Sequence, residues 1–349
     1  MNKKDFECFL ELRAKSGIVF LKDGFLTYLK DNEEYSWKPE SDIDSNFGIY
    51  DAKELYSFFI DNKISSQRTE LFFKNEKIVV IKKPTKTDKN GKEEKETFEL
   101  KCETMPELNK TIDWSIQSGV VIESTLLKNV ANNTTSLLDG HPELKDVFVY
   151  QTGNVLHFVS SNLSAIVDYK INLKNNDFIL EDEFLISREF LLNIIKFMND
   201  ENEIQFCVQK RNEVFEIVIS NSHLRFKTII NKKELPFVMP KFMKKRQKLT
   251  DLEVDVKKMK KTITEEKKKL PSTLQTNFGV LANVENNELI IGTIKYMSLK
   301  PLNGLKLSAY DLLRVFEVYK NEIELYEAKH SYRLDVDGKT SFYINKENL

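Results

Sequence analysis

The sequence of 349 residues offers few side chains that could carry out covalent chemistry. Its histidines and cysteines stand far apart, and no HExxH, HxH or CxxC spacing groups them into a metal site. They are His141, His157, His223 and His330 with Cys8, Cys102 and Cys207. No GxGxxG or GxxxxGKS/T loop is present to hold a nucleotide phosphate. We therefore predict a protein that is not an enzyme and that needs no cofactor or metal ion.

The residues that do indicate a chemistry are basic. Between Lys241 and Lys269 stand twelve Lys or Arg against five Asp or Glu, in a chain whose formal net charge is −1. Lysines bind phosphates whatever the base sequence, and salt weakens the binding. Aromatic residues that would stack on bases do not alternate with these lysines. The stretch predicts a surface that follows a nucleic-acid backbone, although lysines that solvate a helix and pair with Glu265 or Glu266 would give the same pattern.

Basic residues on the polar faces of the other predicted helices extend this candidate surface. The full set of candidate DNA-binding residues is Arg13, Lys15, Lys53, Lys63, Lys128, Arg188, Lys196, Lys257, Lys258, Lys260, Lys261, Arg314 and Lys320. The cluster from Lys257 to Lys261 is the densest part of the set.

Three of the predicted helices share one sequence pattern. Asp51, Ser187 and Ser308 each precede apolar residues at the fourth, fifth, seventh and eighth following positions. Asp and Ser can cap a helix by accepting hydrogen bonds from its first amides. The apolar positions form one stripe of a 3.6-residue helix, with a polar residue between the pairs. Each stretch is thus predicted to be a short amphipathic helix packed on an apolar surface.

The surroundings of these helices repeat as well. Predicted hairpins stand before and after each of them, such as 17–30 with an Asp-Gly turn at 23–24. A further helix opens each repeat, at 3–15, 122–138 and 256–269. We predict an α+β fold of three tandem domains of one architecture. Their bounds are 1–105, 106–240 and 241–349, with Pro106 and Pro240 at the breaks.

This order of elements resembles the bacterial type of DNA sliding clamp, the processivity factor of the replicative polymerase. The likeness is clearest over 120–240, where VFVYQTGNVLHFVSSNLSAIVDYKI, FLISREFLLNIIKFM, NEIQFCVQ and FKTIINKKELPFVMP follow one another. The resemblance implies three clamp domains in each of two subunits, joined head to tail in a ring. Helices would line the hole, sheets would form the outer wall, and duplex DNA would pass through.

The same resemblance implies a pocket between the second and third domains for short peptides of a DNA polymerase and a clamp loader. Its candidate residues are Ser161, Leu163, Ala165, Ile166, Pro240, Phe242, Tyr343 and Ile344. The sequence departs from the family at one point. An Asp-Gly-His-Arg-like run is replaced by residues 162–165, Asn-Leu-Ser-Ala, which puts the transfer of this pocket in doubt and is what a divergent, viral form would show.

The remaining features bear on location and on rival functions. No run of 18 apolar residues occurs and the cysteines are odd in number, so we predict a cytoplasmic protein with no membrane segment. The residues alone leave other classes open. These are a viral structural or assembly protein of tandem β-rich domains, a nucleic-acid enzyme with unrecognised catalytic residues, and a clamp-like factor that serves transcription.

Overall fold

The computed structural model describes the following parts of the chain. They are residues 17–22, 24–38, 47–64, 69–74, 77–82, 96–101, 119–136, 146–161, 165–174, 178–196, 198, 203–211, 214–231, 247–252, 255–271, 281–285, 288–291, 294–297, 306–318, 323–327, 331–336, 338 and 340–345. Within them the strands form four sheets, and all strand pairs described are antiparallel.

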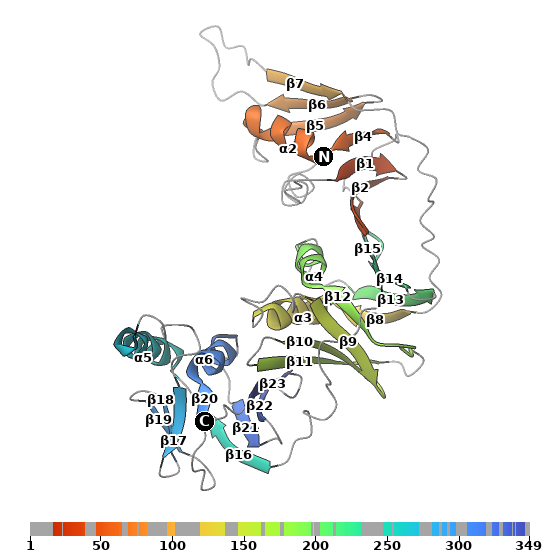
Figure 1. Cartoon of the computed structure of the whole chain (residues 1–349). Helices are drawn as coiled ribbons and strands as arrows, with labels where there is room; N and C mark the ends of the chain where they lie inside the picture. The colour runs from red at the N-terminus through yellow and green to blue at the C-terminus, as the bar shows by residue number, and fades with distance from the viewer. Residues whose placement is uncertain are drawn as a thin grey trace. The chain divides into compact units, whose positions relative to one another are not determined.

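Two of the sheets have eight strands each (Figure 1). The first, in spatial order, consists of β4 (Phe47–Asp51), β1 (Ile18–Lys22), β2 (Phe25–Lys30), β3 (Glu33–Trp37), β15 (Leu224–Asn231), β14 (Val214–Ser220), β13 (Glu203–Arg211) and β8 (Gly119–Glu123). The second consists of β12 (Phe184–Ser187), β9 (Asp146–Thr152), β10 (Val155–Ser161), β11 (Ala165–Asn172), β23 (Thr340–Asn345), β22 (Ser331–Val336), β21 (Ile323–Glu327) and β16 (Gln247–Leu252).

The other two sheets are smaller. One is β5 (Thr69–Lys74), β6 (Lys77–Lys82) and β7 (Glu96–Lys101), and the other is β19 (Ile294–Met297), β18 (Glu288–Ile291), β17 (Leu281–Glu285) and β20 (Lys306–Ser308). The helices of the described residues are α2 (Ala52–Asp61), α3 (Ser124–Ser136), α4 (Arg188–Ile194), α5 (Val256–Lys269) and α6 (Ala309–Val318).

The order of these elements repeats along the chain. From β8 to β15 and again from β16 to β23, the chain runs strand, helix, four strands, helix and three strands. From β1 to β7 it follows the later part of the same order, with four strands, a helix and three strands. The fold predicted from the sequence, a repeated α+β unit, is therefore confirmed. The predicted boundaries at 105 and 240 lie outside the described residues and stay predictions.

Strands of successive repeats pair directly, so each eight-stranded sheet contains a seam. In the first sheet β3 pairs with β15, with Glu34 opposite Lys227. In the second sheet β11 pairs with β23, with Ile166 opposite Tyr343. At both seams, the third of the four strands that directly precede α2 or α4 pairs with the last strand of the next repeat. Sequence patterns within single elements carry no information on these partners.

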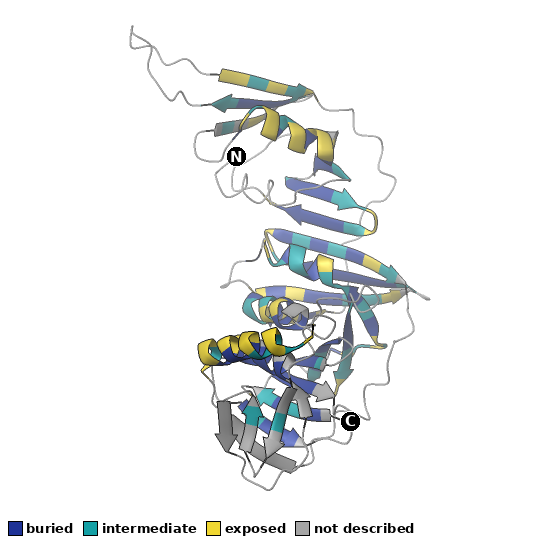
Figure 2. Cartoon of the chain, turned by 60° about the vertical axis from the view of Figure 1, so that its left-hand side comes forward, coloured by how far each residue is buried: buried dark blue, intermediate teal, exposed yellow. Residues whose placement is uncertain are grey.

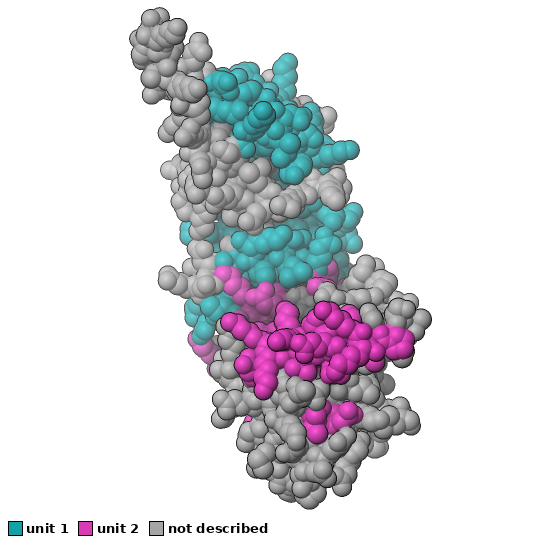
Figure 3. Space-filling model, turned by 90° about the vertical axis from the view of Figure 1, so that its left-hand side faces the viewer, with its two compact units in different colours: residues 1–127, 189–232 teal, residues 128–188, 233–349 magenta. Residues whose placement is uncertain are grey.

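The chain divides into two compact units, which Figure 3 shows in different colours. Unit 1 comprises residues 1–127 and 189–232, and unit 2 comprises residues 128–188 and 233–349. Each unit therefore holds one eight-stranded sheet and one of the smaller sheets.

The local predictions hold where the structure describes them. The three capped stretches form α2, α4 and α6, and the Asp51 carboxylate accepts hydrogen bonds from the amides of Lys53 and Glu54 at 2.8 and 3.1 Å. The predicted helix 122–138 begins two residues later as α3, because its first residues belong to β8. Gly24 occupies the predicted turn between β1 and β2 with a φ of 76°, and Gly153 lies between β9 and β10 with a φ of 56°; glycine adopts both without strain. The predicted helix 3–15 lies outside the described residues.

Candidate nucleic-acid interface

Helix α5 presents a lysine-rich face. The Asp255 carboxylate accepts a hydrogen bond from the Lys258 amide at 3.1 Å and so caps the first turn. Met259, Thr262 and Ile263 are buried on one stripe, which fixes the orientation of the helix on its own domain. The opposite side is exposed, as Figure 2 shows in yellow. The four lysines from Lys257 to Lys261 all lie on this exposed side.

The charge of α5 is strongly positive, with seven lysines against two glutamates. Part of it is paired within unit 2. Lys260 Nζ lies 2.9 Å from Glu317 Oε1 of α6, and Lys261 Nζ lies 3.9 Å from Glu265 Oε1. Lys269 Nζ lies 2.6 Å from Glu266 Oε1. The helix-surface pairs that the sequence left open are thus present, but they leave a net positive face rather than a neutral one.

The other predicted DNA-binding residues are more scattered. Lys53 and Lys63 are exposed on α2 and just after it, but Asp51, Glu54 and Asp61 beside them are exposed too. Lys196 is exposed, whereas Lys128 and Arg188 are half-buried. Arg314 lies in α6, and Arg13, Lys15 and Lys320 lie outside the described residues. Among the described residues, the structure brings predicted basic residues together as a dense cluster only on α5.

Several of the predicted pocket residues meet at the seam between β11 and β23. Ser161 pairs with Ile166, Ile166 pairs with Tyr343, and Ala165 pairs with Ile344. Tyr343 and Ser161 are buried and Ile166 is half-buried. The predicted residues Leu163, Pro240 and Phe242 lie outside the described residues.

An apolar cluster adjoins this part of the seam. Phe148 and Val159 are buried in it, and the half-buried Tyr150, Ile166 and Leu185 pack against them. Ile166 is thus common to the predicted pocket and the cluster.

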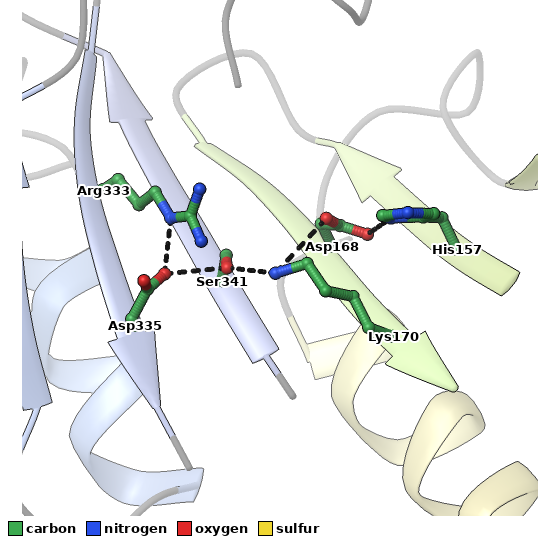
Figure 4. A network of polar contacts seen from close by, with 6 residues as sticks. All are labelled: His157, Asp168, Lys170, Arg333, Asp335 and Ser341. Carbon is green, nitrogen blue, oxygen red and sulfur yellow. Dashed lines mark hydrogen bonds and ion pairs between the residues drawn. The ribbon is translucent and has the colours of Figure 1, made fainter. Parts of the chain in front are cut away.

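A polar network on the same face was not anticipated from the sequence (Figure 4). The Asp168 carboxylate, with a side chain 1% exposed, lies 2.9 Å from His157 Nδ1 and 3.7 Å from Lys170 Nζ. Lys170 donates to Ser341 Oγ across the seam at 2.6 Å, and Ser341 donates to Asp335 at 2.8 Å. Arg333 Nε donates to the same Asp335 oxygen at 2.5 Å. Hydrogen bonds and ion pairs thus connect β10, β11, β23 and β22 across the seam.

Burial and charge act against each other in this network. Burial lowers the pKa of Lys170 despite the favourable charge of Asp168. Burial alone would raise the pKa of Asp335, but the hydrogen bond and charge of Arg333 hold that pKa below its usual value. His157 stacks on Tyr150 with ring centroids 4.4 Å apart. The network therefore links strands on both sides of the seam, and we expect it to stabilise their register.

The described part of the chain shows no other sign of a chemical site. No group of three or more His, Cys, Asp or Glu side chains there could hold a metal ion. None of the helices there combines the length and the apolar character that a membrane crossing requires.

Comparisons with known proteins give a match of structure without a match of sequence. No protein-family model matches the chain, and no curated protein sequence does. Solved structures match over nearly its whole length. A sliding clamp of Pseudomonas aeruginosa bound to griselimycin superposes with a TM-score of 0.73 at 10% identity, covering 99% of this chain and 97% of that one.

Clamps of two other bacteria agree. The DNA polymerase III subunit beta of Borrelia burgdorferi, in complex with a natural product, gives a TM-score of 0.72 at 12% identity and covers 100% of this chain and 97% of that one. The beta subunit from Streptococcus pyogenes gives 0.70 at 14% identity, with 100% and 99% covered. The chain therefore has the fold of the bacterial sliding clamps along its full length.

Proposed function

We propose that the protein is a DNA sliding clamp, a processivity factor that encircles duplex DNA and tethers a DNA polymerase. The correspondence of fold over the whole chain carries this proposal. The lysine face of α5 supplies a surface suited to phosphates and unsuited to reading bases. Retention would be topological, since a closed ring stays on DNA even when each phosphate contact is weak. Such a protein acts in the cytoplasm, on bacterial or viral DNA.

A ring needs a second copy of the chain, and the seams indicate how the copies join. β3 and β11 each pair with the last strand of a neighbouring repeat, β15 and β23. The strand of the third repeat in the same position is β19, and the last strand of the first repeat is β7. Among the described strands, β19 pairs only with β18 and β7 only with β6. A head-to-tail homodimer would pair β19 of one copy with β7 of the other.

The register of the two existing seams predicts the register of this third one. In both seams, the second residue of β3 or β11 lies opposite the fourth residue of β15 or β23. Glu34 thus faces Lys227 in the first seam, and Ile166 faces Tyr343 in the second. The corresponding residues are Lys295 in β19 and Glu99 in β7. Opposite charges at facing positions stabilise an antiparallel pair, and like charges destabilise it. The proposed interface therefore places Lys295 opposite Glu99.

A charge swap tests the interface. Glu99→Lys alone and Lys295→Glu alone should both shift the mass measured by sedimentation from dimer toward monomer. The double variant should recover the dimer, because the charges are opposite again. Glu99 also pairs with Lys77 at 2.6 Å within its own chain, but an exposed pair contributes only about 0–1 kcal/mol. Recovery in the double variant excludes disruption of that pair as the cause, and a monomeric wild-type protein would contradict the interface.

The DNA surface has its own test. Replacing Lys257, Lys258, Lys260 and Lys261 with Glu should weaken DNA association and flatten its salt dependence, while the dimer mass stays unchanged. Each phosphate that the protein no longer neutralises should reduce the slope of log affinity against log salt by about 0.9. Unchanged binding across a salt series would remove these lysines from the proposed DNA surface.

We propose that the β11–β23 seam is a second binding site of the protein. It would bind a short apolar peptide of the polymerase or clamp loader. Its residues would be Ser161, Leu163, Ala165, Ile166, Pro240, Phe242, Tyr343 and Ile344. The support is the half-buried Ile166 beside the apolar cluster of Phe148 and Val159. Ile166→Asp should abolish capture of a polymerase peptide without changing DNA binding, and equal capture by both proteins would refute the site.

A further inference from the structure

Three carboxylates stand beside the lysines of α5. Glu265 and Glu266 belong to α5 itself, and Glu317 reaches it from α6. The lysine side chains in these pairs are 66–79% exposed, so they remain in reach of a phosphate while paired. Lys257 and Lys258 are exposed nearer the start of the helix, next to its Asp255 cap. The pairs with Glu265, Glu266 and Glu317 thus involve Lys260, Lys261 and Lys269, in the middle and at the end of α5.

Pairing with a carboxylate changes how much a lysine contributes to the affinity for DNA. A lysine that neutralises a phosphate releases a counterion, and this release drives nonspecific binding. A lysine held by a carboxylate must exchange one anion for another, so its net contribution is smaller. Exposed pairs are weak, which lets the lysine move between carboxylate and phosphate at little cost. Interactions of this kind form and break easily as a duplex passes.

We propose that Glu265, Glu266 and Glu317 act as competitors for the DNA backbone, which lower the affinity of the lysine face and keep DNA mobile on it. This inference rests on the proposed DNA-clamp function and assigns a role to side chains that oppose binding. Glu317 is the most specific of the three, because its 2.9 Å interaction with Lys260 joins two helices. The Lys261–Glu265 pair at 3.9 Å is the loosest.

The experiment uses the full-length protein and a short duplex whose affinity is followed by fluorescence anisotropy across a salt series. Glu317→Gln should remove this carboxylate as a competitor for Lys260 and steepen the slope of log affinity against log salt by up to about 0.9 for each α5 that touches the duplex. Between 50 and 200 mM salt this corresponds to a drop in affinity about 3.5-fold larger for one helix, or about twelvefold larger for the two helices of a dimer. Adding Glu265→Gln and Glu266→Gln should extend the change.

Two controls separate local pairing from total charge. Glu183→Gln removes the same charge from an exposed position just before β12, which pairs with β9, and should leave the slope at the wild-type value. Lys260→Gln should cancel the effect of Glu317→Gln in a double-mutant cycle, since the lysine that pairs with Glu317 is absent. On a closed circular DNA, the Glu317→Gln protein should diffuse more slowly along the duplex than the wild type.

The outcomes separate this inference from the proposed function. If the wild-type protein binds duplex with a salt-dependent affinity but Glu317→Gln behaves like Glu183→Gln, the competitor role is wrong and the clamp function stands. If the wild-type protein shows no salt-dependent binding and the fourfold Lys→Glu variant is indistinguishable from it, the competitor role and the proposed DNA surface of α5 are both wrong, and retention on circular DNA decides the clamp function. A steeper slope that persists when Lys260 is replaced by Gln would also overturn the pairing with Glu317.

Discussion

The buried Asp168 carboxylate at the β11–β23 seam allows a quantitative prediction. Its side chain is 1% exposed and lies 2.9 Å from His157 and 3.7 Å from Lys170, whose side chains are only 12% and 20% exposed. Removing one partner of a fully buried ion pair costs about 3–5 kcal/mol. The Lys170 distance is long and both partners keep some solvent, so we expect a cost near the lower limit, about 3 kcal/mol, for Asp168→Ala.

Hydrogen exchange followed by mass spectrometry measures this cost locally. A destabilisation of about 3 kcal/mol corresponds to roughly 100-fold faster exchange of the most protected amides of β11 and β23. Asp168→Asn should cost less, because the amide oxygen can still accept a hydrogen bond from His157. Glu189→Gln is the matched control, since its interaction with Lys30 at 3.5 Å is exposed and should matter by less than about 1 kcal/mol. Equal exchange in Asp168→Ala and Glu189→Gln would refute the structural role of the network.

Three further predictions concern stability. The pKa of Asp335 is lower in the folded protein than in the unfolded chain. Its contribution to folding stability is therefore present above the unfolded pKa of about 3.9 and is lost as the pH falls through the lower folded pKa. Acid titration of Asp335→Asn, followed by circular dichroism, should lack that loss of stability. Gly119→Ala would place a Cβ atom 2.2 Å from Cys207 Sγ and should cost about 1–3 kcal/mol in denaturant unfolding, partly recovered by Cys207→Ala. Asp51→Ala removes the cap of α2 and should cost about 1 kcal/mol in the same assay; no change would mean that other interactions hold that turn.

Local order could be predicted from the sequence because its causes are local. The stripe of apolar residues that follows Asp51 forms α2 since burial on one face of a helix recurs every 3.6 residues. Gly24 lies between β1 and β2, where the sequence predicts a turn, and it adopts the positive φ that such a turn requires. The same reasoning places the lysines of α5 on an exposed face, opposite Met259 and Ile263.

The seams and the polar network could not be predicted in this way. Lys170 and Ser341 are 171 positions apart, and neither residue type signals a partner across another repeat. His157 stands in an alternating strand, where a partly buried histidine and an exposed one look alike. From the sequence, Glu317 is likewise only a charged residue on the polar face of a predicted amphipathic helix. The packing of α6 beside α5 brings it to Lys260. Information of this kind resides in the pairing of distant strands and helices.

Retention on circular DNA tests the central claim most directly. The protein, loaded on a nicked circular plasmid and passed through a sizing column in salt high enough to disrupt phosphate binding, should elute with the DNA as a dimer. Cutting the plasmid once should release it, because a ring can slide off a free end. Equal dissociation from circular and linear DNA, or equal retention on both, would contradict a protein that encircles the duplex.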